Sequence, residues 1–374
     1  MKIEGSWISY FSSKAQREGA MNLAQGRPGF SPPKRLLEIL KVLIEENNLH
    51  QYAPGKGDFY LIEETLNLYK KFNNNLKKEN ILIVQGATEG IFLSFLYLSK
   101  KFKNFSILTF DPYYESYPRL AKILGIPLYY IEISPFELNF ERKKLKNLIY
   151  KKNIKGIVLS SPGNPLGKIF TEEEIKFLLN LIKEKNGFLI FDGVYENIYF
   201  NLKPYNPLCK DLKNLIFISS FSKTLSITGW RIGYIITDEK DLKNISSIHD
   251  WTGLSAPFIF QRAISNYLKE KDLEDYLKNL RADLKRNYEF LKNELGKDKT
   301  KLAKVEGGIF AWIQLPEKFK NALDFAKNLF ELKKVAVVPG INFSKKNHNF
   351  FRINLSIPFE DFKAGIKKIK DFLK

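Results

Sequence analysis

The sequence of 374 residues has little cysteine, methionine or histidine: one, two and three residues respectively. The single cysteine, Cys209, cannot form a disulfide within the chain. No histidine lies in a motif with Cys209 that would make this cysteine a nucleophile. Spacings typical of a metal site are also missing, so no metal is expected. The first residues lack the apolar segment of a secretory signal, and no apolar run is long enough to cross a bilayer. We therefore expect a cytoplasmic protein that does not bind membranes.

Acidic residues are outnumbered, with 41 Asp and Glu against 60 Lys and Arg, so the formal net charge is +19. Such a charge could serve a nucleic-acid partner. The lysines are nevertheless spread along the whole chain as doublets, such as Lys70-Lys71 and Lys367-Lys368, on the polar sides of expected amphipathic helices. No helix-turn-helix, zinc-ligand spacing or aromatic-basic RNA signature accompanies them. A solvated basic surface is expected, and no nucleic-acid partner.

Short apolar runs alternate with helical patterns from Ile81 onward. Expected strands are Ile81–Val84, Ser106–Phe110, Leu128–Ile131, Gly156–Ser160, Phe188–Asp192, Leu215–Ser219 and Tyr234–Thr237. One intervening helix, at 171–184, opens with Thr171 and Glu174 at the spacing of a capping box. This alternation predicts an α/β architecture with a largely parallel sheet. After Ala256 long charged helices follow around Phe260–Leu295. Further short strands are expected near Gly308–Gln314, Val335–Val338 and Phe351–Leu355. The change predicts a second, smaller α+β domain.

The strongest chemical signal is the sequence SSFSKT at 219–224, which places Lys223 just after an expected strand, with GWRIGY following at 229–234. A lysine that condenses with an aldehyde needs a desolvated site and neighbouring charges that lower its pKa. A bound phosphate needs hydroxyl donors and a fixed guanidinium such as Arg231. Together these residues predict a site for a molecule that carries both an aldehyde and a phosphate.

The two motifs resemble the S-x-S-K and G-x-R-x-G signature of class I/II, fold-type-I, pyridoxal-phosphate-dependent aminotransferases. Other motifs of that family follow in the family's order along nearly the whole chain. The resemblance implies pyridoxal 5'-phosphate as cofactor, bound covalently by Lys223, which also moves the proton in catalysis. It implies a fold-type-I transferase whose large domain, residues 38–258, holds a mainly parallel seven-stranded sheet. A smaller α+β domain would form from both chain ends, residues 1–37 and 259–374.

The sequence GATEG at 86–90 lies between an expected strand and an apolar helix. Small residues at a helix start let backbone N–H groups face a phosphate, helped by the helix dipole. Such strand-to-helix turns are common, so the motif gains meaning from the resemblance. The resemblance assigns the phosphate contacts to Ala87, Thr88, Ser220, Ser222 and Arg231.

Asp192 ends the apolar strand expected at 188–192. A buried carboxylate is costly unless it is paired. A protonated pyridine nitrogen would pair with it and keep the ring an electron sink. The resemblance implies this role for Asp192 and makes Tyr195 a donor to the cofactor's 3-oxygen. In a chain without Lys223, a capping Asp and a core Tyr would explain the same residues.

Two further cofactor contacts follow from the resemblance. Asn164 lies in the turn SPGNPLG at 161–167, where Leu166 replaces the family's usual Thr, and would be the second donor to the 3-oxygen. Tyr114, in the sequence DPYYESY at 111–117, would stack on the cofactor ring, since a flat ring needs an aromatic face.

Arg352 lies inside the apolar sequence FFRINL at 350–355, and a buried arginine needs an anion. An internal salt bridge would satisfy it. The resemblance instead implies that Arg352 binds the substrate α-carboxylate through both guanidinium donors, with Asn164 beside it and Gly26 closing over it. It also implies that Tyr52, in QYAPG, reaches the phosphate of a neighbouring subunit, so that a homodimer shares its active sites.

The resemblance is closest to the methionine/glutamine/kynurenine transaminase branch, through residues 22–32, 51–54 and 110–117. It implies transfer of an α-amino group between an amino acid, of methionine, glutamine or aromatic type, and a 2-oxo acid. The alternatives are an aspartate-type aminotransferase and a pyridoxal-phosphate-dependent carbon–sulfur β-lyase on the same fold. A DNA-associated regulator with an aminotransferase-like domain would need an added DNA-binding domain, for which we expect no room at the N-terminus.

Overall fold

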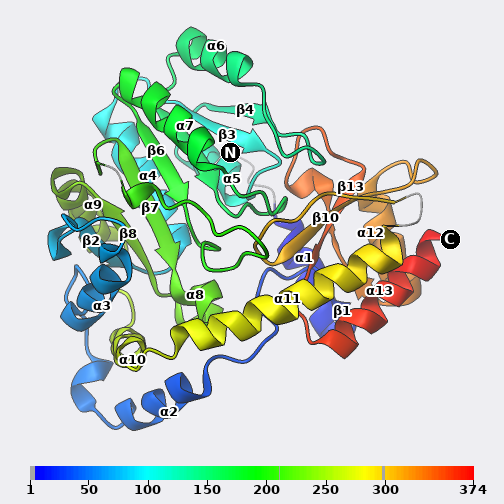
Figure 1. The fold of residues 1–374 in the computed structure, drawn as a ribbon, viewed down its shortest axis with the longest axis horizontal. Helices are drawn as coiled ribbons and strands as arrows, with labels where there is room; N and C mark the ends of the chain where they lie inside the picture. The colour runs from blue at the N-terminus through cyan, green and yellow to red at the C-terminus, as the bar shows by residue number, and fades with distance from the viewer. Residues whose placement is uncertain (1–4, 210, 297–299) are drawn as a thin grey trace.

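The computed structural model describes residues 5–209, 211–296 and 300–374, and its centre is a seven-stranded sheet (Figure 1). In spatial order the strands are β2 (Ile81–Val84), β8 (Gly233–Thr237), β7 (Leu215–Ser220), β6 (Phe188–Asp192), β5 (Gly156–Ser160), β3 (Ile107–Asp111) and β4 (Leu128–Glu132). Only β8 runs antiparallel to its neighbours, and the other pairs are parallel. The predicted mainly parallel sheet is confirmed, and each predicted strand lies within a residue of its observed position.

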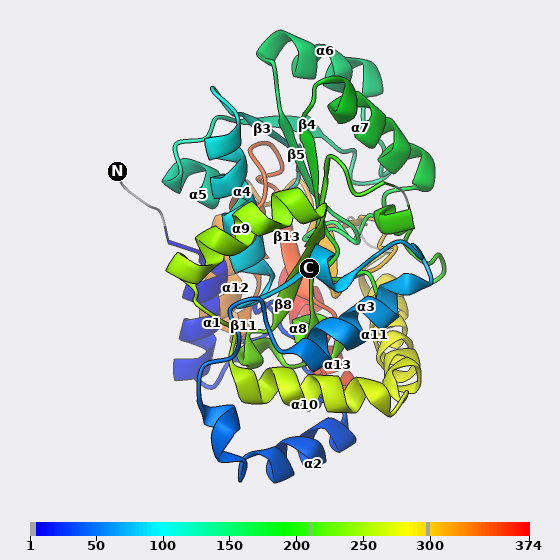
Figure 2. The ribbon, with the colours of Figure 1, turned by 90° about the vertical axis from the view of Figure 1, so that its left-hand side faces the viewer.

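Helices cover both faces of this sheet, and Figure 2 shows α4, α5 and α9 on one side of it. The helices are α1 (Trp7–Arg17), α2 (Lys34–Leu43), α3 (Phe59–Lys70), α4 (Ala87–Lys101), α5 (Ser116–Ile123), α6 (Arg142–Lys152), α7 (Glu172–Glu184), α8 (Phe221–Thr224), α9 (Glu239–Thr252), α10 (Phe258–Lys269), α11 (Leu273–Leu295), α12 (Ala322–Lys333) and α13 (Phe359–Leu373). Alternate residues of each strand enter two separate apolar clusters, because successive side chains point to opposite faces. One cluster includes α4, α5 and α9, and the other includes α3, α6 and α7.

Helix α7 shows how a local pattern fixes an element's start. Thr171 accepts a hydrogen bond from the backbone of Glu174, whose carboxylate accepts one from the backbone of Thr171. Two of the helix's unpaired N–H positions are thereby satisfied, which typically stabilises the helix by about 1 kcal/mol. The predicted capping box is confirmed.

A smaller sheet packs beside the large one and carries the C-terminal strands. Its antiparallel order is β12 (Val338–Pro339), β13 (Phe350–Asn354), β10 (Phe310–Gln314) and β9 (Lys301–Leu302). A separate parallel pair joins β1 (Met21–Asn22) to β11 (Val335–Ala336), so a segment near the N-terminus pairs with one from the C-terminal part of the chain. The expected strand at Val335–Val338 is therefore two short strands, β11 and β12, in different sheets.

The predicted domain boundaries fall close to two helices. The boundary after residue 37 lies inside α2, and the one after residue 258 lies at the first residue of α10. The division at these residues stays a prediction. Within the described ranges, no helix is long and apolar enough to cross a membrane.

Candidate active site

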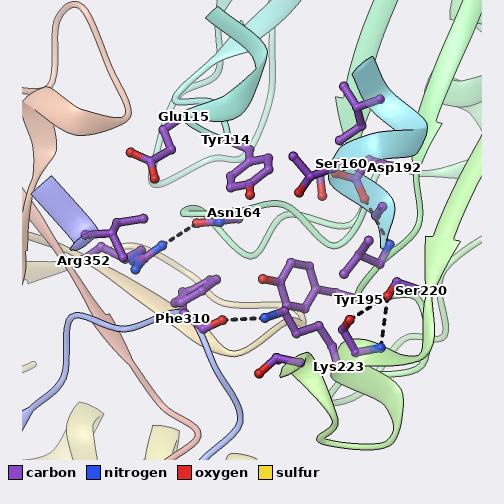
Figure 3. Close-up of a pocket in the computed structure, with 18 of the residues that line it drawn as sticks. Tyr114, Glu115, Ser160, Asn164, Asp192, Tyr195, Ser220, Lys223, Phe310 and Arg352 are labelled. Carbon is purple, nitrogen blue, oxygen red and sulfur yellow. Dashed lines mark hydrogen bonds between the residues drawn. The ribbon is translucent and has the colours of Figure 1, made fainter. Parts of the chain in front are cut away.

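A cavity of about 230 Å³ lies at the carboxyl ends of the central strands, where α/β sheets bind their ligands. The small sheet closes its other side through β10 and β13. Every site residue predicted from the sequence lines this cavity except Tyr52. Figure 3 shows the side chains converging from strand ends, helix starts and the small sheet. Predicted site residues separated by up to 326 positions in the chain, from Gly26 to Arg352, are thus brought together.

Lys223 projects from the short helix α8 into this cavity and donates a hydrogen bond to the carbonyl oxygen of Gly26. Burial lowers the pKa of its amine to about 7, and the positive charges of Arg352 and Arg231 add to the effect. The nearby Asp192 opposes the shift but does not outweigh it. An amine with this pKa is partly neutral near pH 7, which is the form that attacks an aldehyde.

Asp192 is buried at the end of β6, and burial raises the pKa of its carboxyl to about 6. Two donors moderate this rise: the hydroxyl of Tyr117 at 2.8 Å and the backbone N–H of Val194 at 3.2 Å. Tyr117 is thus a hydrogen-bond partner of the site carboxylate, a role that nothing local in the DPYYESY sequence distinguishes.

Three polar side chains surround the open space between Lys223 and Arg352 in Figure 3: Tyr195, Tyr114 and Asn164. Burial raises the pKa of the Tyr195 phenol far above neutrality, so the phenol keeps its proton and can donate a hydrogen bond. Tyr114 presents an aromatic ring to the cavity and packs edge-on against Tyr117, with ring centroids 5.6 Å apart. These residues can hold a flat ring from its face and its edge.

The start of α4 forms the first half of an anion site. Ala87 and Thr88 are its first two residues, whose backbone N–H groups precede the first intrahelical hydrogen bonds. Gly86 caps the helix with φ +80°, and a Cβ there would lie 2.4 Å from Nη2 of Arg231. Glycine therefore lets the guanidinium approach the helix start, which favours a bound anion.

Arg231, Ser220 and Ser222 form the second half of this anion site. The Arg231 guanidinium donates to the carbonyl oxygens of Thr228 at 3.0 Å and Gln85 at 3.4 Å, which fixes its direction. The hydroxyl of Ser220 lies 2.8 Å from the carbonyl oxygen of Ile232 and 2.9 Å from the hydroxyl of Ser222. We call Ala87, Thr88, Ser220, Ser222 and Arg231 the phosphate cup. A phosphate is its natural ligand, because hydroxyls, amides and a guanidinium all donate hydrogen bonds to anions.

Arg352 lies fully buried on β13 at the opposite end of the cavity. Its Nη1 donates to Oδ1 of Asn164 at 3.0 Å, its Nη2 donates to the carbonyl oxygen of Ala24, and the Phe310 ring lies 3.9 Å from Cζ. Burial lowers its pKa to about 10, so it stays charged near pH 7. Within residues 5–209, 211–296 and 300–374, no carboxylate forms an ion pair with it and its Nε has no partner. The internal salt bridge is not formed, and the buried charge is left for an incoming anion.

Tyr52 lies outside the cavity, on the loop before α3, with 81% of its surface exposed. The predicted contact of Tyr52 with a neighbouring subunit stays a prediction. The cavity also contains Ile8, Glu115, Ser160, Thr228 and Phe310, which sequence patterns did not single out. Glu115 lies within the DPYYESY sequence and Thr228 precedes GWRIGY, but only the fold shows that these side chains reach the cavity.

These features fit a flat aromatic aldehyde that carries a phosphate, and the expected cofactor, pyridoxal 5'-phosphate, is such a molecule. A partly neutral lysine could bond to the aldehyde, Asp192 could pair with a ring nitrogen, and the phosphate cup offers donors at one end. Arg352 remains for a carboxylate at the other end.

Comparisons with known proteins agree with this chemistry. A family model described as aminotransferase class I and II matches residues 18–369. The chain is 30% identical over 363 residues to a probable aspartate aminotransferase of Methanocaldococcus jannaschii, covering 95% of this chain and 93% of the relative. It is 29% identical over 371 residues to the (5-formylfuran-3-yl)methyl phosphate transaminase of the same organism, covering 98% and 95%.

Solved structures are similar over almost the whole chain. The aspartate aminotransferase of Thermus thermophilus with maleate has a TM-score of 0.91 at 21% identity, covering 99% of this chain and 97% of that one. Bna3p of Saccharomyces cerevisiae, described as a candidate kynurenine aminotransferase, has a TM-score of 0.89 at 22% identity, covering 99% and 96%. At these identities the likeness shows the shared fold.

Proposed function

The chain belongs to the class I and II aminotransferases and is a pyridoxal-phosphate-dependent aminotransferase, and from that premise we propose that the cavity around Lys223 is its active site. One observation carries the assignment: Lys223, Asp192, the phosphate cup and Arg352 line a single cavity in the order that an amino acid and this cofactor require. The reaction is the transfer of an α-amino group to a 2-oxo acid.

Bound pyridoxal phosphate supplies an aldehyde that condenses with amines and a ring that withdraws electrons from the substrate Cα. The Nζ of Lys223 would hold the cofactor, and its neutral amine would take the substrate's Cα proton and return it. Its lowered pKa keeps part of the amine ready for both roles near pH 7. Asp192 would keep a proton on the ring nitrogen, while Tyr195 and Asn164 would donate hydrogen bonds to the ring's 3-oxygen.

Arg352 binds the substrate α-carboxylate in this proposal. Its guanidinium is buried, unpaired with any described carboxylate and fixed by Asn164 and Ala24, so two of its N–H groups can donate to a carboxylate held in one orientation. Gly26 lies against this arginine: a Cβ at Gly26 would be 3.9 Å from Nη1 of Arg352. The segment around Gly26 therefore covers the carboxylate site and excludes water from it.

Two classes of amino donor remain in competition. The names of the relatives support aspartate, since several full-length relatives are described as aspartate aminotransferases. The motifs at 22–32, 51–54 and 110–117 support methionine, glutamine or aromatic donors. We propose aspartate first, because its support comes from whole-chain similarity. The cationic residues that line the cavity, Lys223, Arg231 and Arg352, all have roles assigned above. The side-chain carboxylate of an aspartate substrate therefore needs a cation from outside this cavity.

We also propose a homodimer with shared active sites. In the single chain Thr88 and Arg231 of the phosphate cup are exposed, which is unusual for donors to a tightly held phosphate. Near the cup lie exposed apolar side chains, with 92% of Trp251 and 81% of Tyr52 accessible. A second subunit over this face would bury them and close the cup.

A spectroscopic screen tests the function. Purified holoenzyme is mixed with each of the twenty amino acids, and the cofactor's absorbance and the released oxo acid are followed. An active donor converts the cofactor to its amine form and releases one 2-oxo acid. Pyruvate with ammonia, formed from cysteine conjugates, would favour the β-lyase alternative. Borohydride reduction should place the cofactor on one peptide, which contains Lys223, and label on another lysine would refute the assignment.

A further inference from the structure

A carboxylate lies directly behind the phosphate cup, where a negative charge would oppose a bound phosphate. Glu89 occupies the first turn of α4, immediately after Thr88. Both of its oxygens are engaged away from the cup: Oε2 accepts the backbone N–H of Gln85, and Oε1 lies 3.0 Å from Nδ1 of His249. Its role is therefore not contact with the cofactor but contact with the residues that carry the cup.

His249 reaches Glu89 from helix α9 and is fully buried. An ionised carboxylate can only accept hydrogen bonds, so Nδ1 of His249 is the donor. Its Nε2 has no hydrogen-bond partner among the residues that the structure describes. The ring is held through a single polar contact, which joins α9 to the first turn of α4.

Gln85 completes the arrangement on the other side of Gly86. Its side-chain amide donates to the carbonyl oxygens of Gly253 at 2.7 Å and Ser255 at 3.1 Å. The backbone carbonyl oxygen of Gln85 accepts a hydrogen bond from the Arg231 guanidinium at 3.4 Å. The chain at 253–255 fits closely here, since a Cβ on Gly253 would lie 2.1 Å from Oε1 of Glu89. A line of contacts thus runs from the end of α9 to the cup arginine.

We propose that Gln85, Glu89 and His249 are positioning residues that hold the phosphate cup in its binding geometry. They fix the helix start that carries Ala87 and Thr88 and the carbonyl that orients Arg231. Without them the cup donors would have to be ordered on binding, which costs affinity for the phosphate group. This inference rests on the proposed function, because it assumes that the cofactor phosphate occupies the cup.

The test compares two probes that differ only in the phosphate. Full-length protein is freed of cofactor, and its affinity for pyridoxal phosphate and for pyridoxal is measured by absorbance titration. Both probes react with Lys223, but only the first uses the cup. We expect Glu89→Ala and His249→Phe to weaken pyridoxal phosphate binding about tenfold and to change pyridoxal binding less than about twofold. Lys100→Ala, at an exposed position of the same helix, is the control and should leave both affinities unchanged.

The outcomes separate the inference from its premise. Equal weakening of both probes would mean a general disturbance of the fold and would overturn the positioning role. Unchanged pyridoxal phosphate affinity in both variants would overturn it as well. Wild-type protein that binds neither probe would overturn the proposed active site, and the positioning role with it. A double variant that is no weaker than the worse single one would support a single connected unit.

Discussion

Lys223 shows how one side chain acquires reactivity from its surroundings. Its amine is partly neutral near pH 7 because burial and two arginines disfavour the charged form, and Asp192 only partly compensates. The same arginines have a second purpose, since one belongs to the phosphate cup and the other faces the substrate end of the cavity. The positive charges of Arg231 and Arg352, which would bind the phosphate and the substrate carboxylate, therefore also lower the pKa of Lys223.

The first prediction concerns the pH at which Lys223 reacts. The rate at which cofactor-free protein binds pyridoxal phosphate should rise with pH through about 7 and then level off, because only the neutral amine attacks. Replacing Arg352 with Met removes a positive neighbour, so the pKa of Lys223 rises and the midpoint moves to higher pH. Stopped-flow absorbance measures both curves. A wild-type midpoint near the ordinary lysine value of 10.5 would contradict the structure.

The second prediction concerns Asp192. Asp192→Asn should still bind the cofactor but lose on the order of a hundredfold in kcat, because a neutral amide cannot hold the proton on the ring nitrogen. Tyr117→Phe removes only the hydroxyl that donates to Asp192 and should cost less, roughly tenfold. Single-turnover kinetics with bound cofactor provides both values. Nearly normal turnover in Asp192→Asn would make the carboxylate purely structural.

The third prediction concerns Arg352. Arg352→Lys keeps a positive charge but loses the two-pronged guanidinium, so kcat/KM should fall on the order of a hundredfold. Cofactor affinity should change little, since the phosphate cup lies at the other end of the cavity. Steady-state kinetics and cofactor titration of the same preparation separate the two effects. A loss of cofactor affinity as large as the loss of kcat/KM would assign Arg352 to the cofactor.

At the scale of elements, the start of α4 depends on a close approach to β8. A Cβ on Gly233 would lie 2.7 Å from the backbone nitrogen of Ala87, so glycine in β8 lets the helix start lie against the strand. Gly86 makes the same allowance for Arg231. The phosphate cup is thus assembled from two elements that glycines allow to touch.

The fourth prediction uses two glycines with similar positive φ angles. Gly86→Ala places a methyl group on the Arg231 guanidinium and should weaken pyridoxal phosphate binding by about tenfold or more. Gly125→Ala is the control for a positive φ, since Gly125 has φ +68° against +80° for Gly86 but has nothing within 4 Å of the added Cβ. Gly86 also has ψ 163°, a backbone region that is essentially restricted to glycine, so Gly86→Ala adds backbone strain to the collision with Arg231. Equal cofactor affinity in the two variants would mean that the added methyl group and the Arg231 guanidinium move apart without weakening phosphate binding.

At the scale of the whole molecule, Tyr52 and Trp251 are exposed apolar side chains, and Thr88 and Arg231 of the phosphate cup are exposed as well. Asp250 lies close to the loop of Tyr52, since a Cβ on Gly55 would be 2.7 Å from its Oδ1. The loop of Tyr52 therefore lies close to the end of α9, which leads into the chain at 253–255 that contacts Gln85. A partner bound over this loop would stand next to the phosphate cup.

The fifth prediction follows from that arrangement. Light scattering should find a homodimer, and mixing inactive Tyr52→Ala and Lys223→Ala proteins should restore activity in heterodimers that contain one intact site. Random exchange yields half heterodimers, each with one of two sites intact, so about a quarter of wild-type activity is expected for weakly interacting subunits. Either protein refolded alone is the control. A monomer at working concentration would contradict the shared site.

Much of this molecule follows from local sequence. Alternating apolar strands and helical patterns predict the seven-stranded sheet, and Thr171 with Glu174 predicts the start of α7. The positions of Lys223, Asp192 and the helix start after Gly86 follow from strand ends that a short motif marks. These features depend on a few neighbouring residues, whose spacing alone determines backbone hydrogen bonding and which face is buried.

Other features depended on tertiary structure. The hydrogen bond from Tyr117 to Asp192 and the contact of Glu89 with His249 join residues far apart in the chain. Only the tertiary structure shows that Arg352 has no carboxylate partner among the described residues. No local pattern distinguishes Tyr117 from Tyr113, because desolvation and hydrogen-bond geometry arise only when distant elements pack. The sequence by itself thus determined the helices and strands, the motifs, and the cofactor that the family resemblance of those motifs implies. The packing of the two sheets decided which side chains meet, because burial sets the pKa of Lys223 and directs the charge of Arg352 into the cavity.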